Sequence, residues 1–368
     1  MHRLGFVLEQ TLGHVAHGRN LERALANETG VEATVIRVGY SGPEGLQRLP
    51  GLRTWSWRAS VAARNGLREA LRRGPLDSIF IHTQVAALLA GEIMHTVPTV
   101  ISLDATPRLF DREGEAYGHR RSPELIELMK RRANVRAFTA ATRLVTWCQW
   151  AAYSLVSEYD VPADKIDVIP PGVDLNLFRP LLVAKRSERV RILFVGGQFE
   201  RKGGPDLLEA ARLLGDSVEL DLVTSSGDLV IPAGVKARVH RNLTPQSDEL
   251  VSLYRNAHVF VLPSRGDCMP QAVTEALACG LPVVATRVGA IPEMVTDNVN
   301  GHLVPTRDPR TLAAAIDSLV KSPGRRNQMG RWGRVLAQQE YDASRNNRRI
   351  FALMKSLAER RVEAMRSA

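Results

Sequence analysis

The sequence predicts an α/β protein of two domains, each built on a parallel sheet covered by helices. Its 368 residues exceed what a single ordinary hydrophobic core accommodates. Leu, Val and Ala dominate the apolar residues and aromatic residues make up only 5%, which is typical of buried parallel sheets. Short apolar runs alternate with helical patterns in both halves of the chain, as expected for parallel strands joined by crossover helices.

The first half contains four strand-like runs separated by helical patterns. They span Gly5 to Leu8, Ile79 to Ile81, Val97 to Leu103 and Leu144 to Trp147. A further short run at residues 166–169 leads into the Pro170–Asp174 stretch, and Pro180 follows soon after. Because prolines and glycine at this density interrupt regular structure, we place the domain junction here and assign residues 1–174 to an N-terminal domain.

The second half repeats this architecture. Its strand-like runs span Val190 to Val195, Val218 to Val223, Val259 to Leu262 and Leu281 to Ala285. Helical patterns between and after them span Pro205 to Leu214, Ser247 to Asn256, Ala272 to Cys279 and Pro309 to Val320. We therefore expect a C-terminal domain over residues 175–340, followed by a helical tail over residues 341–368. In such domains the active site lies at the carboxyl ends of the strands.

Targeting signals are not evident in the sequence. Glu9 interrupts the apolar run near the N-terminus, so no signal peptide is predicted, and no run approaches the roughly 18 apolar residues of a membrane-spanning helix. The three cysteines, Cys148, Cys268 and Cys279, form no C-x-x-C pair and lie in apolar segments, as free thiols in a reducing compartment do. We expect a cytoplasmic protein without disulfides.

The net charge of +10 is carried mainly by arginine and is concentrated between residues 53 and 73. That segment contains one acidic residue, Glu69, and these arginines: Arg53, Arg58, Arg64, Arg68, Arg72 and Arg73. Trp55 and Trp57 are interleaved with them. One interpretation is a basic amphipathic helix lying peripherally on an anionic membrane face, and the other is a solvated helix whose tryptophans pack inward. Nucleic acid is not expected as a partner, because no nucleic-acid-binding motif accompanies the arginines.

The stretch from Val259 to Val295 indicates an anion-binding site. A buried strand is followed by a loop bearing Asp267, and Pro270 is expected at the first position of a helix. The backbone N–H groups of Gln271 and Ala272 would then have no acceptor within the helix and would point, with the positive end of the helix dipole, at a diphosphate. Glu275, about one turn further on, could accept hydrogen bonds from the paired hydroxyls of a ribose.

A second segment, Ile192 to Gly204, predicts a strand that runs into a glycine-containing loop with two adjacent cations. Gly196 and Gly197 would let a ligand approach the backbone. Arg201 and Lys202 could neutralise the charge that develops on a departing diphosphate.

The first of these segments resembles the E-x7-E signature of the family 4 retaining glycosyltransferases. The matching positions are Pro263-Ser264, Asp267, Met269-Pro270, Glu275-Ala276 and Gly280-x-Pro282-Val283-Val284-Ala285-Thr286. The resemblance implies a GT-B fold, in which two Rossmann-like domains face each other across a cleft and the C-terminal helix packs back toward the N-terminal domain. It also implies that Glu275 holds the donor ribose, that Met269 and Pro270 lie at the donor, and that Asp267 lies at the donor sugar.

The chain departs from the family at several positions. Asp267 stands where Glu is usual and reaches about 1.5 Å less far, and Cys268 and Pro270 replace common glycines. The second segment is similar to the family's G-x-x-x-x-x-K-G pattern, which implies that Lys202 grips the diphosphate. Gly197 occupies the place of a common arginine, for which Arg201 could substitute.

The N-terminal half resembles the family more loosely and is expected to bind the acceptor. Gly13, in Thr11-Leu12-Gly13-His14, matches a glycine-rich loop against the donor phosphates. Asp104 stands where the family has a His beside the donor sugar; it could orient the sugar or polarise the acceptor hydroxyl, or it could cap a helix. His82 ends another strand on the same rim, and a core role is the more natural interpretation for it.

These inferences predict a retaining hexosyltransferase that uses a nucleotide-diphosphate sugar and an unidentified glycan, lipid or small-molecule acceptor. The sequence contains no D-x-D motif. The similar Glu219-Leu220-Asp221 lies within a strand pattern and not in a loop. We therefore expect neither a metal ion nor another cofactor. Two alternatives remain: an epimerase or phosphorylase of the same fold, and a non-catalytic nucleotide-sugar-binding protein.

Overall fold

A computed structural model describes residues 1–10, 13–39, 55–118, 123–181 and 189–367. The chain divides into two compact units. Unit 1 comprises Met1–Leu109, Arg121–Pro171 and Ser344–Ala368, and unit 2 comprises Phe110–Arg120 and Gly172–Ala343. A short segment of the N-terminal half, Phe110–Arg120, is thus part of the same unit as the C-terminal half.

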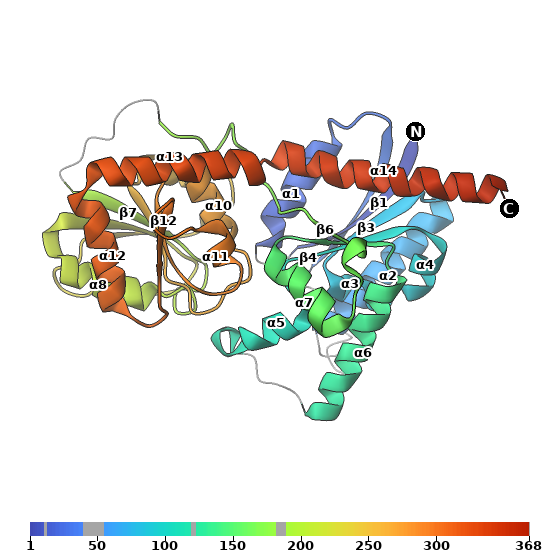
Figure 1. The fold of residues 1–368 in the computed structure, drawn as a ribbon, viewed down its shortest axis with the longest axis horizontal. Coiled ribbons are helices and arrows are strands. Elements are labelled where there is room, and N and C mark those ends of the chain that lie inside the picture. Colours follow the sequence, from blue (N-terminus) through green and yellow to red (C-terminus); the bar gives the residue numbers. More distant parts are fainter. Residues whose placement is uncertain (11–12, 40–54, 119–122, 182–188, 368) are drawn as a thin grey trace. The chain divides into compact units, whose positions relative to one another are not determined.

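Unit 1 is built on a six-stranded parallel sheet with the strand order β2-β1-β3-β4-β5-β6 (Figure 1). The strands are β1 (His2–Glu9), β2 (Val31–Val38), β3 (Ser78–His82), β4 (Thr99–Leu103), β5 (Arg143–Thr146) and β6 (Ile166–Val168). The helices that connect them are α1 (His14–Leu25), α2 (Trp55–Arg73), α3 (Gln84–Ala87), α4 (Gly91–Thr96), α5 (Pro107–Arg112), α6 (Glu124–Ala140) and α7 (Gln149–Tyr159). Strands β3 and β4 are buried along their whole length, as their continuous apolar runs predict.

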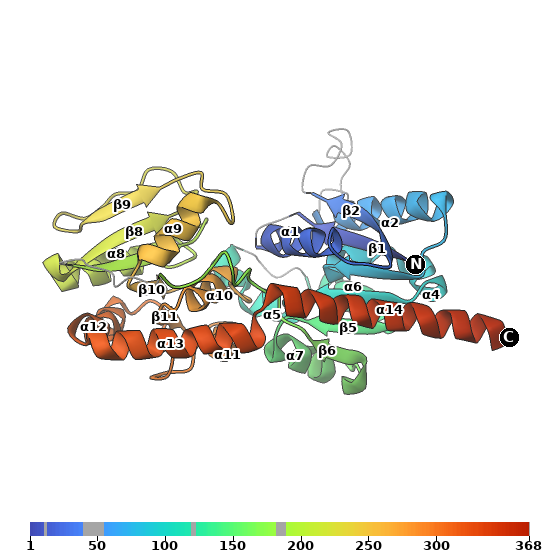
Figure 2. The same ribbon diagram turned by 90° about the horizontal axis from the view of Figure 1, so that it is seen from above.

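The C-terminal helix α14 (Ala343–Ser367) completes the core of unit 1. Phe351 of α14 makes an edge-on contact with Phe6 of β1 at 6.0 Å between ring centroids. The hydroxyl of Ser78 donates to the carbonyl of Met354 at 3.0 Å, and the amide of Asn346 donates to the carbonyl of Pro170. Figure 2 shows this helix lying alongside the sheet of unit 1. The prediction that the C-terminal helix packs back on the N-terminal domain is confirmed.

Unit 2 repeats the design with a parallel sheet of strand order β12-β11-β10-β7-β8-β9. The strands are β7 (Val190–Val195), β8 (Val218–Val223), β9 (Ala237–His240), β10 (Val259–Leu262), β11 (Val283–Thr286) and β12 (Gly301–Val304). Its helices are α8 (Gly204–Leu214), α9 (Asp248–Asn256), α10 (Gln271–Ala278), α11 (Ile291–Met294), α12 (Pro309–Lys321) and α13 (Pro323–Glu340). The predicted α/β class with two parallel sheets is confirmed.

The helix α13 is fastened to the rest of unit 2 by Arg334. Its guanidinium donates to the carbonyl oxygens of Ala278 at 2.7 Å, Phe178 at 2.9 Å and Leu175 at 3.3 Å. Ala278 is the last residue of α10, so a cation lies where the helix dipole is negative. Arg334 thereby anchors the far end of the helix on which Glu275 lies. None of the helices in the described ranges combines the length and the apolar character that a bilayer crossing requires.

Candidate active site

The loop between β10 and α10, together with α10 itself, carries Asp267 and five of the predicted donor-binding residues, at the carboxyl edge of the sheet. Pro270 is the N-cap of α10 with extended backbone angles, not its first helical residue as predicted, and Val273 closes the turn by donating its N–H to the Pro270 carbonyl at 3.0 Å. Within the described chain, the N–H groups of Gln271 and Ala272 have no acceptor. The buried Gln271 Nε2 also lacks a partner there. Three donors therefore remain for a ligand at this helix start.

Glu275 lies on α10 and is 8% exposed. Burial raises the pKa of its carboxyl to about 7, although a hydrogen bond from the Tyr254 hydroxyl lowers it. Tyr254, on α9, is itself fully buried; its hydroxyl also lies 3.3 Å from the Ala272 carbonyl, and its ring stacks on Phe260 at 5.8 Å. Burial and the neighbouring Glu275 raise the pKa of Tyr254. A buried carboxylate with one hydroxyl donor retains acceptor capacity for further hydroxyls.

Lys202 and Asp267 form an ion pair, which joins the two segments singled out in the sequence. The Lys202 ammonium contacts Oδ2 of Asp267, and the two side chains are 15% and 9% exposed. The hydroxyl of Ser264 donates to the same carboxylate oxygen at 3.4 Å. The predicted diphosphate cation and the predicted sugar-side carboxylate are therefore neighbours, and each neutralises the other in the free protein.

The two loops are held together at Gly203. This residue has φ +78°, and a Cβ atom there would lie 1.9 Å from the carbonyl oxygen of Pro263. Only glycine fits both the left-handed backbone and this separation. Gly203 is the N-cap of α8, and it lets the strand end at Pro263 touch the loop that carries Lys202.

Arg201 is held by neighbouring groups within unit 2. Its guanidinium donates to the Gly266 carbonyl at 2.7 Å and to Oε1 of Gln198 at 2.5 Å, and it lies 4.2 Å from the ring centroid of Tyr117. Tyr117 belongs to the short segment of the N-terminal half that is part of unit 2, and its ring packs on the Arg201 side chain. The sequence did not indicate this contact.

The same segment places Glu113 on the backbone of the site. The Glu113 carboxylate accepts hydrogen bonds from the N–H groups of Gly289 and Asp267, which lower its pKa. Burial, the largest influence, raises it, and the charge of Asp267 acts in the same direction, so the net pKa is raised. An acidic side chain from the N-terminal half therefore occupies backbone donors beside Asp267.

A hydroxyl cluster follows β8 and supports the glycine loop. Thr224, Ser225 and Ser226 donate to the Gly197 carbonyl at 3.1, 2.8 and 3.3 Å. The Ser226 hydroxyl also accepts the Phe199 N–H at 3.0 Å. We did not predict this cluster, although three hydroxyl residues directly after a buried strand were a readable signal at the carboxyl edge of the sheet.

The predicted residues of the N-terminal half lie at the strand ends of unit 1. Asp104 follows β4 and is half-buried; its carboxylate has no hydrogen-bond or ion-pair partner in the described part of the chain. Gly13 is the N-cap of α1 with φ −66°, and a Cβ atom there would meet nothing within 4 Å. Its neighbours Thr11 and Leu12 lie outside the described residues, as does Arg53 of the basic segment.

His82 is buried in an aromatic cluster at the same strand ends. Its ring stacks on Trp147 at 5.1 Å, and its Nε2 lies 2.8 Å from Nδ1 of His14. The ring of His17 packs edge-on against the rings of His82 and Trp147. Burial lowers the pKa of His82 well below its ordinary value and that of His17 to about 3, so both rings are neutral. His82 is thus a core residue.

The acidic residues of the E-L-D sequence lie within β8, as predicted, and are engaged by neighbours. Glu219 accepts from Arg191 at 2.6 Å, and Asp221 lies 2.8 Å from Nε2 of His240. Among the described residues, no group of three or more His, Cys, Asp or Glu side chains is placed to hold a metal ion.

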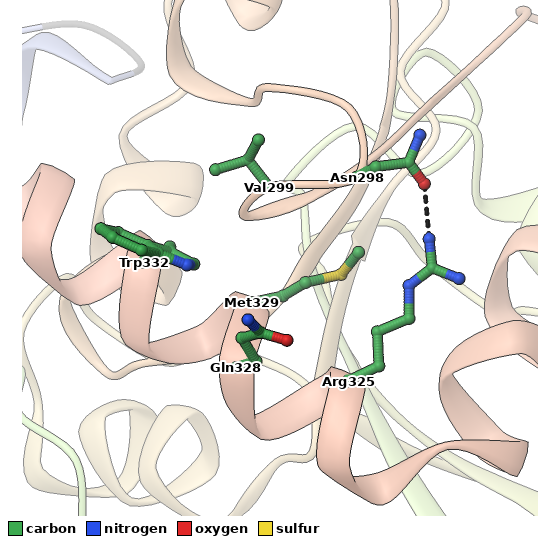
Figure 3. Close-up of a pocket in the computed structure, with 6 residues that line it drawn as sticks. All are labelled: Asn298, Val299, Arg325, Gln328, Met329 and Trp332. Carbon is green, nitrogen blue, oxygen red and sulfur yellow. Dashed lines mark hydrogen bonds between the residues drawn. The ribbon is translucent and has the colours of Figure 1, made fainter.

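A separate pocket of ≈ 430 Å³ lies on unit 2 and is shown in Figure 3. It is lined by Asn298, Val299, Arg325, Gln328, Met329 and Trp332. Arg325 donates to Asn298 across it at 2.5 Å. Asn298 and Val299 lie in the turn before β12, so this part of the pocket lies at the amino edge of the sheet, whereas the loop of Asp267 lies at its carboxyl edge. It is not part of the candidate active site.

Comparison with known proteins identifies the family of the chain. A family model described as Glycosyltransferase Family 4 matches residues 13–177, and one described as Glycosyl transferases group 1 matches residues 189–322. Two curated relatives are named D-inositol 3-phosphate glycosyltransferase. The one from Arthrobacter sp. (strain FB24) is 30% identical over 76% of this chain and 70% of its own length, and the one from Pseudarthrobacter chlorophenolicus is 30% identical over 84% and 77%. The chain belongs to the family 4 glycosyltransferases and is a glycosyltransferase.

Solved structures share the fold at low sequence identity. Sucrose-phosphate synthase from Thermosynechococcus elongatus superposes with a TM-score of 0.77 at 18% identity, covering 97% of this chain and 99% of the other. Anabaena Alr3699/HepE, solved in complex with UDP, gives 0.70 at 17% identity, covering 97% and 100%. These neighbours confirm the predicted GT-B class.

Proposed function

We propose that this glycosyltransferase transfers a hexose from a nucleotide-diphosphate sugar to an acceptor hydroxyl, with retention of anomeric configuration and without a metal ion. The observation that carries the proposal is the ion pair of Lys202 with Asp267, which brings the cationic loop to the start of the helix bearing Glu275. A ribose on Glu275 and a diphosphate over the start of α10 would place the sugar toward Asp267.

In this proposal, hydrogen-bond donors of the protein itself stabilise the negative charge that develops on the leaving group. As the bond between the anomeric carbon and the diphosphate breaks, negative charge grows on the phosphate oxygens. The Lys202 ammonium, the N–H groups of Gln271 and Ala272, and Gln271 Nε2 are the donors that would receive it. Preorganised donors of this kind can replace a divalent cation, and no other cofactor is part of the proposal.

Retention is proposed to follow from attack on the face that the leaving group vacates. The acceptor oxygen forms its bond to the anomeric carbon while the bond to the diphosphate breaks. The acceptor's proton passes to the departing phosphate oxygen, so charge and atoms balance. Asp104, whose carboxylate has no partner in the described chain, is the proposed group for orienting a sugar or acceptor hydroxyl.

Donor and acceptor candidates come from proteins similar to this one. Anabaena Alr3699/HepE has been solved in complex with UDP-glucose, which makes UDP-sugars the first donors to test. The curated relatives are named for D-inositol 3-phosphate, so that compound is the first acceptor to test, followed by glycan and lipid-linked acceptors. The relative from Segniliparus rotundus has the same name and is 37% identical, but the match spans only 47% of its length, so the choice of acceptor rests on the relatives that are matched over more of their length.

The test is release of free nucleotide diphosphate that requires an acceptor. We expect Lys202→Ala and Glu275→Ala to reduce kcat/KM at least 100-fold, because each removes a donor contact. Lys236→Ala is the matched control, since Lys236 forms an ion pair with Asp216 on the surface of the same unit. Nucleotide release without acceptor, or unchanged turnover in both site variants, would refute the proposal; an epimerase or phosphorylase would give sugar products without acceptor-dependent nucleotide release.

We also propose a cytoplasmic enzyme that contacts an anionic membrane peripherally. The three cysteines Cys148, Cys268 and Cys279 are buried and form no disulfide in the described part of the chain, which suits a reducing compartment. On α2, the predicted membrane helix, Arg68 pairs with Glu92, and Arg72 and Arg73 pair with Glu69. Trp55 packs against the core whereas Trp57 is 43% exposed. The charges of α2 are therefore partly compensated within the protein.

A further inference from the structure

The first two turns of α6 expose a concentration of apolar side chains that the rest of unit 1 does not cover. Leu125 is 70% exposed, Met129 62%, Ile126 45% and Leu128 42%. The buried residues of this helix begin only at Asn134. In Figure 1 the N-terminal end of α6 extends away from the sheet of unit 1. Four exposed apolar residues among the first six of a helix are unusual for a surface that meets only water.

Basic residues continue the same helix face. Leu125 and Met129 are four residues apart, and Arg132 and Arg136 follow at seven and eleven residues from Leu125, spacings that keep all four on one side of a helix. Arg132 and Arg136 are exposed and have no ion-pair partner among the described residues. The face is therefore apolar at its free end and positively charged further along.

The other charges of α6 are accounted for by nearby groups. Lys130 pairs with Glu127 at 2.8 Å, and Arg131 pairs with Asp160 of the following loop at 3.2 Å. Glu124 is the acidic residue at the free end, and the helix geometry turns it about 100° away from Leu125. The uncompensated charge on the face of Leu125 is thus positive.

We propose that this face, comprising Leu125, Leu128, Met129, Arg132 and Arg136, docks the protein on an anionic lipid membrane. Leu125 lies about 10 Å along the helix axis from Arg132, at about 1.5 Å per residue. An oblique helix would then immerse its apolar end by the roughly 5–10 Å typical of interfacial helices while its arginines reach the lipid phosphates. Charge complementarity favours a membrane over a second copy of this chain, which carries the same net charge of +10.

Vesicle co-sedimentation tests this proposal without reference to catalysis. The full chain is mixed with vesicles of phosphatidylglycerol and phosphatidylcholine, or of phosphatidylcholine alone. We expect binding to the anionic vesicles, at least a tenfold loss in Leu125→Ser/Met129→Ser, and a loss of about fivefold for each of Arg132→Gln and Arg136→Gln. Because these side chains are exposed, their variants should keep the circular dichroism spectrum and unfolding temperature of the wild type.

A quadruple variant of α2 separates this surface from the one expected from the sequence. Arg64, Arg68, Arg72 and Arg73 are each replaced by Gln, and we expect vesicle binding to fall less than threefold. The proposal is overturned if the wild type does not bind anionic vesicles, if the serine variant binds as tightly as the wild type, or if only the α2 variant loses binding. It is also overturned if analytical ultracentrifugation shows a dimer that the serine variant dissociates, since the face would then join two copies.

Discussion

Replacing Glu275 by glutamine should make the protein more stable above neutral pH while weakening the proposed binding of the donor. Glu275 is buried on α10, and glutamine has nearly the same shape, can still accept the Tyr254 hydrogen bond and carries no charge. The stability gain arises because the wild-type carboxylate must be held charged in a buried position at high pH. The activity loss arises because a neutral amide is a weaker acceptor for paired ribose hydroxyls.

The magnitude follows from the pKa of Glu275. Burial raises it from an ordinary 4.5 to about 7, and with each pKa unit worth about 1.4 kcal/mol this corresponds to about 3.5 kcal/mol. Because the folded-state pKa is raised, the stabilising contribution is fully present below pH 4.5 and is lost as the pH rises through about 7. Between about pH 5 and about pH 8, the contribution of Glu275 to the free energy of unfolding falls by about 2.5 kcal/mol.

The assay is urea denaturation of wild type and Glu275→Gln at these two pH values. The difference in free energy of unfolding between the two proteins cancels the titration of every other group. We expect the glutamine variant to gain about 2.5 kcal/mol relative to the wild type on going from about pH 5 to about pH 8. A difference that does not change with pH would refute the reasoning, because it would mean that Glu275 titrates normally in the folded protein.

Four further predictions concern the same unit. For the wild type, kcat/KM for the donor should rise with pH through about 7, as Glu275 ionises, and this limb should disappear in Glu275→Gln; a wild-type profile flat from pH 5 to 8 would contradict it. Lys202→Met should cost about 3–5 kcal/mol of unfolding free energy by leaving Asp267 buried and unpaired, and adding Asp267→Asn should restore most of that stability but no activity; denaturation and turnover of the single and double variants check this. Gly203→Ala should cost at least about 3 kcal/mol through its left-handed backbone and the 1.9 Å approach to a carbonyl oxygen, measured as a loss of unfolding free energy. Arg334→Met should lower the free energy of unfolding by about 2 kcal/mol, because three carbonyl oxygens lose their hydrogen-bond donor. Urea denaturation at several pH values measures this loss and should show that the pH at which Glu275 titrates is unchanged.

The fold was predictable where strands are buried on both faces. β7, β10 and β11 show continuous or nearly continuous apolar runs, and each was located from the sequence to within about two residues. β8 was also located, from its alternation of apolar and acidic residues. β2, β9 and β12 were missed. All three lie at the edges of their sheets and contain half-buried or exposed positions, so their sequences lack the apolar run that marks a central strand.

The residues of the site that lie close together in the sequence were predictable. The spacing of Asp267 and Glu275 places both acids on one loop and the helix that follows, so their proximity needs no tertiary information. Glu113 and Tyr254 could not be inferred in this way, because each reaches the loop from a distant element. The position of Pro270 as cap instead of first helical residue also depends on the tight turn closed by Val273.

The pairing of Lys202 with Asp267 offers a reason why an aspartate can stand at the position of the first glutamate in the E-x7-E signature that this segment resembles. In the free protein the shorter carboxylate lies on the ammonium, so neither buried charge is left without a partner. Under the proposed function, an incoming diphosphate would offer Lys202 a second anion and release Asp267, whose oxygens could then accept hydroxyls of the adjoining sugar. Each group would exchange one partner for another on donor binding, whereas loss of Lys202 alone leaves the buried Asp267 without its cation in the free protein.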